Sequence, residues 1–193
     1  MKYLWMDCES TGLDPKLNDI ITIAMIIDID GKIVDRLDLK IQPKNWDNIS
    51  PEALKVNGIT IEEMKTFMAP SEAHAKIITF FKKYVDQYKK NKTMHDKLIP
   101  AGYNVKFDLG FLSEFFAKQG DKYIGSFIDY HCLDIASIVL FLQLHGAIQI
   151  PGFKLVEVAK SMNIEFAAHN AMADIETTRI IAYKLMDKIK VLS

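Results

Sequence analysis

Apolar residues fill much of the first forty positions, in runs that have the spacing of strands. The segment YLWMDCE predicts one strand, and IITIAMIIDI predicts a second that is buried on both faces, because it is nearly all apolar and rich in β-branched residues. Asp30-Gly31 follows as the signal of a two-residue hairpin between two strand-like runs. The chain is therefore predicted to begin with an antiparallel meander of three strands.

After residue 50 the apolar positions recur at the spacing of helices. Ser50 and Pro51 have the features of an N-cap and a first helical residue, and Gly58 is the expected end of that helix. Thr60 and Glu63 form the pattern of a capping box for the next short helix. Further helices are predicted at about 71–90, 107–120, 133–145, 153–162 and 170–190, with short strands within 98–105 and 129–135.

This order of elements predicts the fold class. A meander followed by alternating helices and strands is typical of an α/β fold in which a mixed sheet has helices on its faces. The chain has 193 residues, of which 49% are hydrophobic and 25% charged, enough for one sizeable core. It contains no internal repeat and no linker rich in Gly, Ser or Pro. We therefore expect a single domain over residues 1–193.

Charge and cysteine content exclude several classes of protein. A net charge of −1 leaves no broad basic surface for binding long duplex nucleic acid. Cys8 and Cys132 lie far apart and form no CxxC pair, which argues against a zinc site and a disulfide framework. One local cluster of lysines either guides a nucleic-acid strand or is a solvated helix end; it consists of Lys89, Lys90, Lys92 and Lys97.

The sequence also predicts where in the cell the protein is found. The first residues, MKYLWMDCESTG, reach acidic positions too early for the core of a signal peptide, and no apolar run is long enough to span a membrane. We expect a soluble, intracellular protein of the cytoplasm that does not contact a membrane.

Five polar residues have no evident part in folding: Asp7, Glu9, Asp108, His169 and Asp174. Asp7 and Glu9 stand two residues apart at the end of an apolar run, so on a strand both carboxylates leave the same face. Two neighbouring anions repel each other unless a cation lies between them. Carboxylates with no cluster of thiolates or imidazoles nearby suit Mg²⁺ or Mn²⁺.

The order of the motifs resembles a known family. DxE followed by STG, then NxxxFD, then HxAxxD is similar to the DEDDh branch of the DnaQ-like 3′-to-5′ exonucleases, which includes proofreading subunits, ribonuclease T and oligoribonuclease. The segments LWMDCESTGLDPKLNDIITIA and LDIAS resemble oligoribonuclease, whereas NVKFDLGFL and HNAMADIETT resemble the proofreading and general exonucleases. The resemblance covers nearly the whole chain, including ISPEALKVNGIT. It implies an RNase H-like mixed sheet, in agreement with the predicted meander.

The resemblance also implies a metal site and a role for each residue. Two ions, Mg²⁺ or Mn²⁺, would share Asp7; Glu9 and Asp174 would complete the site of the ion that binds the attacking water, and Asp108 would hold the other ion largely through waters. His169 is the expected general base. Because five residues turn a continuous helix by about 140°, His169 is expected in the loop or cap before the helix that carries Asp174.

Substrate contacts are predicted from the same resemblance. Thr11, Leu13 and Phe107 are the expected contacts to the terminal nucleotide, since an apolar side chain can pack on any base. For Leu13 and Phe107, packing in the core is the equal alternative. Asn104 lies one helical turn before Asp108 and either faces the site or caps the helix.

These residues together predict a metal-dependent 3′-to-5′ exonuclease that releases nucleoside 5′-monophosphates from single-stranded DNA or RNA ends. Two alternatives remain: an oligoribonuclease-like enzyme for very short RNA, and a non-catalytic module that binds nucleic acid or docks on a polymerase. The complete set of acids and His169 argue against the module. Because the sequence ends about 19 residues after Asp174, we expect a stand-alone enzyme without a polymerase partner. A homodimer is also compatible with the sequence, since oligomers are common in the family.

Overall fold

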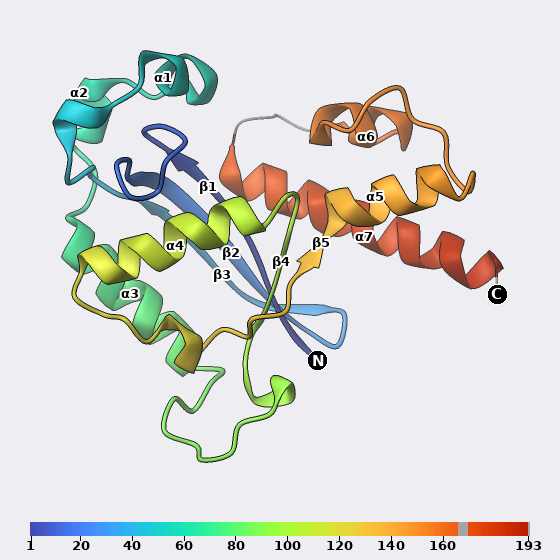
Figure 1. Ribbon diagram of the computed structural model, residues 1–193, viewed down its shortest axis with the longest axis horizontal. Coiled ribbons are helices and arrows are strands. Elements are labelled where there is room, and N and C mark those ends of the chain that lie inside the picture. The colour runs from blue at the N-terminus through green and yellow to red at the C-terminus, as the bar shows by residue number, and fades with distance from the viewer. Residues whose placement is uncertain (166–169, 193) are drawn as a thin grey trace.

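The protein is built around one mixed sheet. The computed structural model describes residues 1–165 and 170–192 (Figure 1). Five strands lie in the order β3-β2-β1-β4-β5. The first three form the antiparallel meander, and β4 and β5 run parallel to β1, which confirms the predicted α/β fold. The strands are β1 (Lys2–Ser10), β2 (Ile20–Ile29), β3 (Lys32–Lys40), β4 (Ile99–Gly102) and β5 (Leu133–Asp134).

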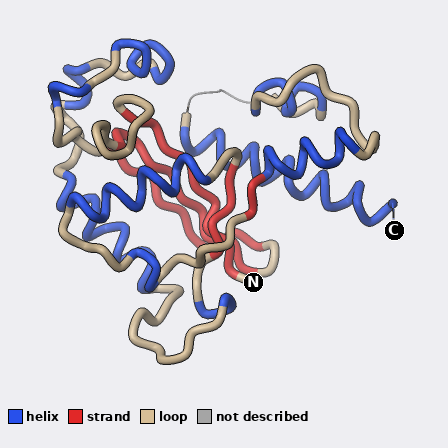
Figure 2. Tube along the Cα trace, in the orientation of Figure 1, coloured by secondary structure: helices blue, strands red, loops and turns tan. Residues whose placement is uncertain are grey.

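Helices surround the sheet and alternate with its later strands (Figure 2). In the described part of the chain no helix has the length and apolar character needed to cross a membrane. The α-helices are α1 (Pro51–Asn57), α2 (Ile61–Met64), α3 (Pro70–Lys82), α4 (Lys106–Lys118), α5 (Ile135–Leu144), α6 (Leu155–Ser161) and α7 (Ala171–Leu192).

Local signals in the sequence explain where the early elements turn. Asp30 and Gly31 have φ angles of 51° and 85°, as the hairpin between β2 and β3 requires. Ser50 caps α1 by accepting a hydrogen bond from the backbone N–H of Ala53, and Gly58 ends that helix at φ 68°. The predicted capping box of α2 is present as well. These sequence-based predictions are confirmed.

The predicted helix at 71–90 is wrong at its C-terminal end, because α3 ends at Lys82. Beyond that point the backbone and side chains find partners outside the helix. Lys2 Nζ donates to the carbonyl of Tyr84 at 2.7 Å, and the Tyr84 hydroxyl donates to Asp35 at 3.0 Å. Tyr88, which continues the apolar periodicity, is 80% exposed. Tertiary contacts thus end the helix while the apolar spacing continues.

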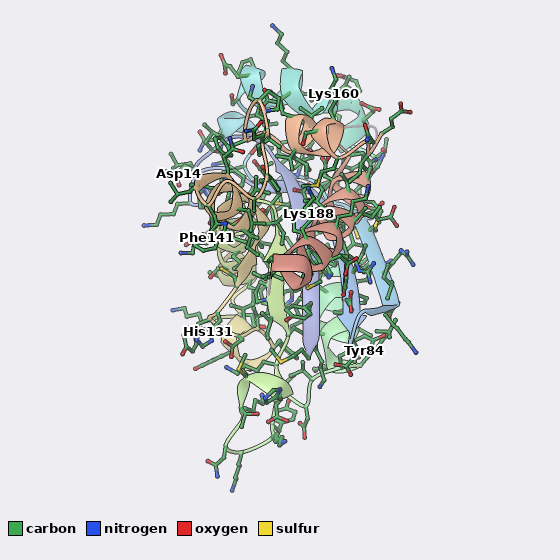
Figure 3. All side chains as sticks on the ribbon, turned by 90° about the vertical axis from the view of Figure 1, so that its right-hand side faces the viewer. Asp14, Tyr84, His131, Phe141, Lys160 and Lys188 are labelled. Atoms are coloured by element: carbon green, nitrogen blue, oxygen red, sulfur yellow. The ribbon has the colours of Figure 1, made fainter. Side chains whose placement is uncertain are left out.

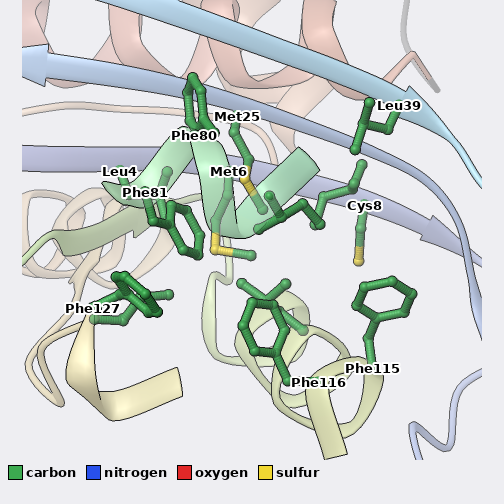
Figure 4. Packing of buried hydrophobic residues seen from close by; sticks show 14 of the residues in the cluster. Leu4, Met6, Cys8, Met25, Leu39, Phe80, Phe81, Phe115, Phe116 and Phe127 are labelled. Carbon is green, nitrogen blue, oxygen red and sulfur yellow. The ribbon is translucent and has the colours of Figure 1, made fainter. Parts of the chain in front are cut away.

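Each face of the sheet has its own core. On one face α3 and α4 pack against the alternating residues Leu4, Met6 and Cys8 of β1, with Phe81 and Phe116 among the largest contributors (Figure 4). The other face carries Trp5 of β1 and is covered by α5, α6 and α7. Because side chains alternate along a strand, the carboxylates of Asp7 and Glu9 lie on the Trp5 face, toward α7.

Candidate active site

Three carboxylates from distant parts of the chain meet at the end of β1. Each of Asp7, Glu9 and Asp174 offers an oxygen, and these oxygens lie within 4.8 Å of one another. Figure 1 shows why: α7 begins beside the end of β1 and crosses the sheet from there. The structure thus brings together the acids of the first and last sequence motifs.

The first turn of α7 positions Asp174. Asn170 precedes the helix and accepts a hydrogen bond from the backbone N–H of Ala173 at 3.0 Å through its side chain. The N–H of Asp174 donates to the carbonyl of Asn170 at 2.8 Å. A carboxylate in the first turn is favoured by the helix dipole, so the start of α7 both holds and stabilises Asp174.

Asp108 reaches the same strand from α4. Strand β4 pairs with β1 only from Tyr3 to Trp5, and the backbone N–H of Cys8 donates instead to Asp108 Oδ1 at 3.0 Å. The turn out of β4 is tight: a Cβ at Gly102 would lie 2.8 Å from the carbonyl oxygen of Met6. The early end of β4 therefore leaves the edge of β1 open for Asp108.

Burial, together with neighbouring carboxylates, raises the pKa values of Asp7 and Asp108. Burial raises the pKa of Asp7 well above its ordinary value, and the charges of Asp108, Asp174 and Glu9 raise it further. Burial likewise raises the pKa of Asp108 to about 7, against the hydrogen bonds from Cys8. None of the ion pairs among the described residues involves Asp7 or Asp108. A set of carboxylates like this fits hard divalent cations such as Mg²⁺ or Mn²⁺.

An apolar pocket of about 470 Å³ adjoins the carboxylates. Glu9 belongs both to this pocket and to the carboxylate cluster, so the two are continuous. Leu13, which is 84% exposed, and Phe107, which is 37% exposed, both contribute to its walls. Its lining residues are Cys8, Glu9, Ser10, Gly12, Leu13, Ser50, Glu52, Ala53, Val56, Asn57 and Phe107. We refer to this space as the pocket below.

Thr11, the third predicted substrate contact, does not line the pocket. Its side chain is fully buried, and its hydroxyl accepts a hydrogen bond from the backbone N–H of Asp19 at 2.9 Å. The backbone N–H of Thr11 donates to the carbonyl of Asp19, also at 2.9 Å. Thr11 closes the loop that carries Leu13, and a direct contact to substrate stays a prediction.

Two further residues were predicted from the sequence to lie at the site, His169 and Asn104. His169 lies outside the described residues. Asn104 does not cap α4, since the N-cap of that helix is Val105 and no side-chain cap bond is present there. Asn104 has φ 61° and donates its backbone N–H to Asp134 at 2.8 Å, so it forms the turn before the helix.

The lysine cluster lies in the long loop after α3, at the lower edge of the molecule in Figure 1 and far from the end of β1. Lys89 pairs with Asp96, and Lys92 donates to the carbonyls of Gln87 and Ser126. These contacts favour a structural role in the loop over the guiding of a strand.

Sequence reasoning missed the wall of the pocket formed by α1. Ser50, Glu52, Ala53, Val56 and Asn57 line it. The signal for this wall is structural: α1 buries none of its residues, yet it contains Val56, which is 58% exposed. An apolar residue on a helix that contributes nothing to the core indicates a surface for a ligand or partner.

Comparison with known proteins agrees with the site. The family described as Exonuclease (RNase_T) matches residues 4–182. The PolC-type DNA polymerase III of Pediococcus pentosaceus is 25% identical over 183 residues, which cover 94% of this chain and 11% of that protein. The PolC-type polymerase of Thermotoga maritima is also 25% identical, over 190 residues, 97% of this chain and 12% of that protein. The chain thus spans about a tenth of the length of these polymerases.

Among solved structures, E. coli exonuclease I in complex with a dT13 oligonucleotide is similar to this chain, with a TM-score of 0.80 and 21% identity. The match covers 99% of this chain and 42% of exonuclease I. This likeness confirms the RNase H-like fold. Since the family match extends over nearly all of the sequence, from the start of β1 into α7, the chain belongs to the DnaQ-like 3′-to-5′ exonuclease family.

Proposed function

We propose that the chain is a metal-dependent 3′-to-5′ exonuclease that releases nucleoside 5′-monophosphates from single-stranded DNA or RNA. One observation carries the proposal. The oxygens of Asp7, Glu9 and Asp174 lie within 4.8 Å of one another, and Glu9 also lines a pocket of about 470 Å³. A metal-binding cluster joined to a pocket of small-ligand size suits removal of one nucleotide at a time.

In this proposal four carboxylates hold two ions, Mg²⁺ or Mn²⁺. Asp7, Glu9 and Asp174 would hold one of them, and Asp108 would share the second with Asp7. When bound, such ions neutralise charge on the phosphodiester and lower the pKa of an attacking water. The Cys8 N–H holds the carboxylate of Asp108, and the start of α7 holds the backbone of Asp174.

The pocket would take the 3′-terminal nucleotide. Leu13 and Phe107 would pack on the terminal base from the loop after β1 and from α4. The ring of Phe107 already lies 5.0 Å from that of Phe111, which limits how far it can turn. Such packing tolerates any base, as an exonuclease without sequence preference requires.

His169 is proposed as the general base. Its place in the sequence, two residues before the start of α7, would let it serve the water that attacks the phosphorus, while Asp174 acts from the helix itself. This role belongs to the proposal, since His169 lies outside the described residues.

Single-stranded DNA is the substrate that the comparisons favour, because similar exonuclease I structures hold oligonucleotides such as dT13. RNA, and very short RNA in particular, is the alternative carried from the sequence. The PolC-type relatives are DNA polymerases. Association of this chain with a polymerase is therefore the alternative to the stand-alone enzyme expected from the sequence.

A digestion assay tests the proposal. Oligonucleotides of both sugars, labelled at the 3′ or the 5′ end, should lose nucleotides stepwise from the 3′ end with Mg²⁺ and not with EDTA. A series of lengths separates a general exonuclease from one confined to very short RNA. Cutting of a closed circular single strand would show an endonuclease, and binding without any cleavage would leave the non-catalytic module.

A further inference from the structure

We propose that a partly buried ion pair between Asp19 and Lys118 sets the shape of the pocket and thereby the affinity for the substrate. The pair lies outside the pocket, so both members are positioning residues. This inference rests on the proposed function, because it assigns the pair an effect on substrate binding at the same site.

Asp19 joins three segments through its carboxylate. The residue is 8% exposed, at the end of the loop between β1 and β2. Its Oδ2 accepts hydrogen bonds from the backbone N–H groups of Lys44 at 2.9 Å and Asn45 at 2.7 Å, and its Oδ1 accepts from Lys118 Nζ at 2.8 Å. Both oxygens are thus engaged, and each ties the loop to a different part of the chain.

Lys118, the last residue of α4, uses its ammonium group in the same way. Besides the bond to Asp19, its Nζ donates to the carbonyl of Pro15 at 3.0 Å and to that of Asn18 at 2.7 Å. All three donors of the ammonium therefore bind the one loop. A charge with every hydrogen bond satisfied holds its neighbours in one geometry better than an isolated pair does.

The segments that the pair joins are the walls of the pocket. The loop from Thr11 to Asp19 carries Gly12 and Leu13, and α4 carries Phe107 at its opposite end. The segment bound by Asp19 Oδ2 leads directly into α1, and the N–H of Ser50 donates to the carbonyl of Thr11 at 2.7 Å. The ion pair ties the loop to α4, and together with the Ser50 bond it fixes the loop, α1 and α4 relative to one another.

The loop itself leaves little room for adjustment. A Cβ at Gly12 would lie 2.5 Å from the side chain of Asn18, so the two ends of the loop pack closely. Asn18 also donates to the carbonyl of Asn48 at 2.6 Å, just before α1. Loss of the ion pair would loosen these contacts together, and the walls of the pocket would separate.

The carboxylates do not depend on this pair. Asp7 and Glu9 are set by the pairing of β1 with β2, and Asp174 by the start of α7. Asp108 stands on α4, as Lys118 does, but at the other end of the helix, where the backbone N–H of Cys8 holds its carboxylate. Breaking the pair should therefore raise KM and change kcat much less. A residue needed only for general stability would lower the melting temperature and leave KM unchanged.

The test compares wild type with Lys118→Met, which keeps the length of the side chain and removes its charge and donors. We expect KM for a single-stranded oligonucleotide in Mg²⁺ to rise about tenfold, with kcat within about threefold of wild type. Lys118→Arg, which retains charge and donors, should recover most of the affinity. Asp19→Asn keeps the side-chain shape and provides a second variant if Lys118→Met does not fold.

Two control variants address stability. Lys83→Met removes an exposed pair with Asp35, beside Tyr84 and at the opposite end of the molecule from Asp14 of the pocket loop (Figure 3). It should leave KM at the wild-type value. Arg179→Met removes a pair with Asp28 of similar burial on the other face of the sheet, and it should destabilise the protein without the same rise in KM.

The outcomes separate this inference from the proposed function. If wild type degrades and binds the oligonucleotide while Lys118→Met and Asp19→Asn keep its KM, the inference is wrong and the function stands. Equal increases of KM in Arg179→Met and Lys118→Met would also overturn it, because they would show a general loss of stability. If wild type neither binds nor degrades single strands in Mg²⁺, the proposed function fails first.

Discussion

The two halves of the candidate site are built on opposite principles. In the carboxylate half, Asp7, Glu9 and Asp174 bring like charges together, and burial raises the pKa of Asp7. In the pocket half, polar groups satisfy one another: Ser10 Oγ donates to the carbonyl of Gly12 at 2.6 Å, and Asn57 donates to that of Ser10 at 3.3 Å. The pocket half thus consists of polar groups that bond to one another, whereas the carboxylate half gathers like charges, which suits the binding of a cation.

A similar contrast separates the two ion pairs at the ends of β2. Asp19, just before the strand, has both oxygens bound. Asp28 lies near the end of β2, and its Oδ2 accepts hydrogen bonds from Arg179 Nε at 2.7 Å and from the Tyr183 hydroxyl at 2.9 Å. The buried Oδ1 of Asp28 has no hydrogen-bond partner among the described residues. The fully bonded pair lies beside the pocket, and the incompletely bonded pair fixes the middle of α7. The more rigid attachment thus belongs to the pocket, which needs a defined shape.

The largest expected effect tests the carboxylate half. Asp7→Ala should lower the rate of hydrolysis by at least about a thousandfold, because it removes the acid shared by both ions. In EDTA the same variant should melt at the same temperature as wild type or slightly higher, since one buried like charge is gone. Thermal melting and a digestion assay in Mg²⁺ measure both. Full activity of Asp7→Ala would show that this carboxylate is not needed for hydrolysis.

The next effect separates chemistry from binding within the same half. His169→Ala should lower kcat by about 10²- to 10⁴-fold with KM little changed, because a general base acts in the chemical step. The rate of wild type should rise with pH through the pKa of the imidazole. A large rise of KM with kcat preserved would assign His169 to the pocket half instead.

The sequence indicated nearly all residues of the carboxylate half but only some residues of the pocket half. Asp7, Glu9, Asp108 and Asp174 could be predicted because each stands in a short motif and because charges in apolar surroundings need a reason. The strands and most helices followed from periodicity and from caps such as Ser50. These signals are local in the chain.

The rest depended on contacts between distant segments. The Thr11 hydroxyl accepts a hydrogen bond from the Asp19 N–H, a bond that only the closed loop reveals, and the predicted contact of Thr11 to the substrate stays a prediction. The end of α3 depended on Lys2 and Asp35, which lie about fifty to eighty residues away along the chain. The wall formed by α1 and the role of Lys118 depend in the same way on tertiary packing, so no local pattern could predict them.

A middle-sized effect tests the pocket half directly. Phe107→Ala should raise KM for single strands about tenfold with kcat less affected, because stacking on a base stabilises binding by about 1–3 kcal/mol. Phe141→Ala is the matched control: Phe141 is 65% exposed on α5 (Figure 3) and does not line the pocket. Steady-state kinetics on one oligonucleotide compares them. Equal KM values for both variants would show that Phe107 packs on Phe111 and does not contribute to substrate binding.

A smaller effect concerns pH and stability without metal. Burial raises the pKa of Asp108 from 3.8 to about 7, so the folded protein binds more protons than the unfolded chain between these values. The contribution of Asp108 to the free energy of unfolding in EDTA should therefore be fully present below pH 3.8 and be lost as the pH rises through about 7. Carboxyls with lowered pKa, such as Asp35 and Asp129, lose their contribution below this window.

Urea unfolding in EDTA at about pH 5 and about pH 7.5 measures the decline. Asp108→Asn should reduce it, because that side chain does not titrate, and the raised pKa of Asp7 should account for part of what remains. Mg²⁺ should stabilise wild type at the higher pH by binding the folded state. A free energy of unfolding that increases over this interval in EDTA would contradict the picture of repelling carboxylates.

The smallest expected effect concerns Glu52, an acid in the pocket wall that lies outside the carboxylate half. Glu52 lines the pocket, and a hydrogen bond from the Ser50 hydroxyl at 2.7 Å lowers its pKa, so the side chain is ionised at neutral pH. Its charge opposes an approaching phosphodiester strand. Glu52→Gln should therefore lower KM about twofold at low salt, and the difference should vanish as added salt screens the charge. Glu62→Gln on α2, also exposed and outside the pocket lining, is the control. A higher KM in Glu52→Gln would instead show that this carboxylate accepts a hydrogen bond from the substrate, and the polar groups of the pocket half would then bond to the nucleotide as well as to one another.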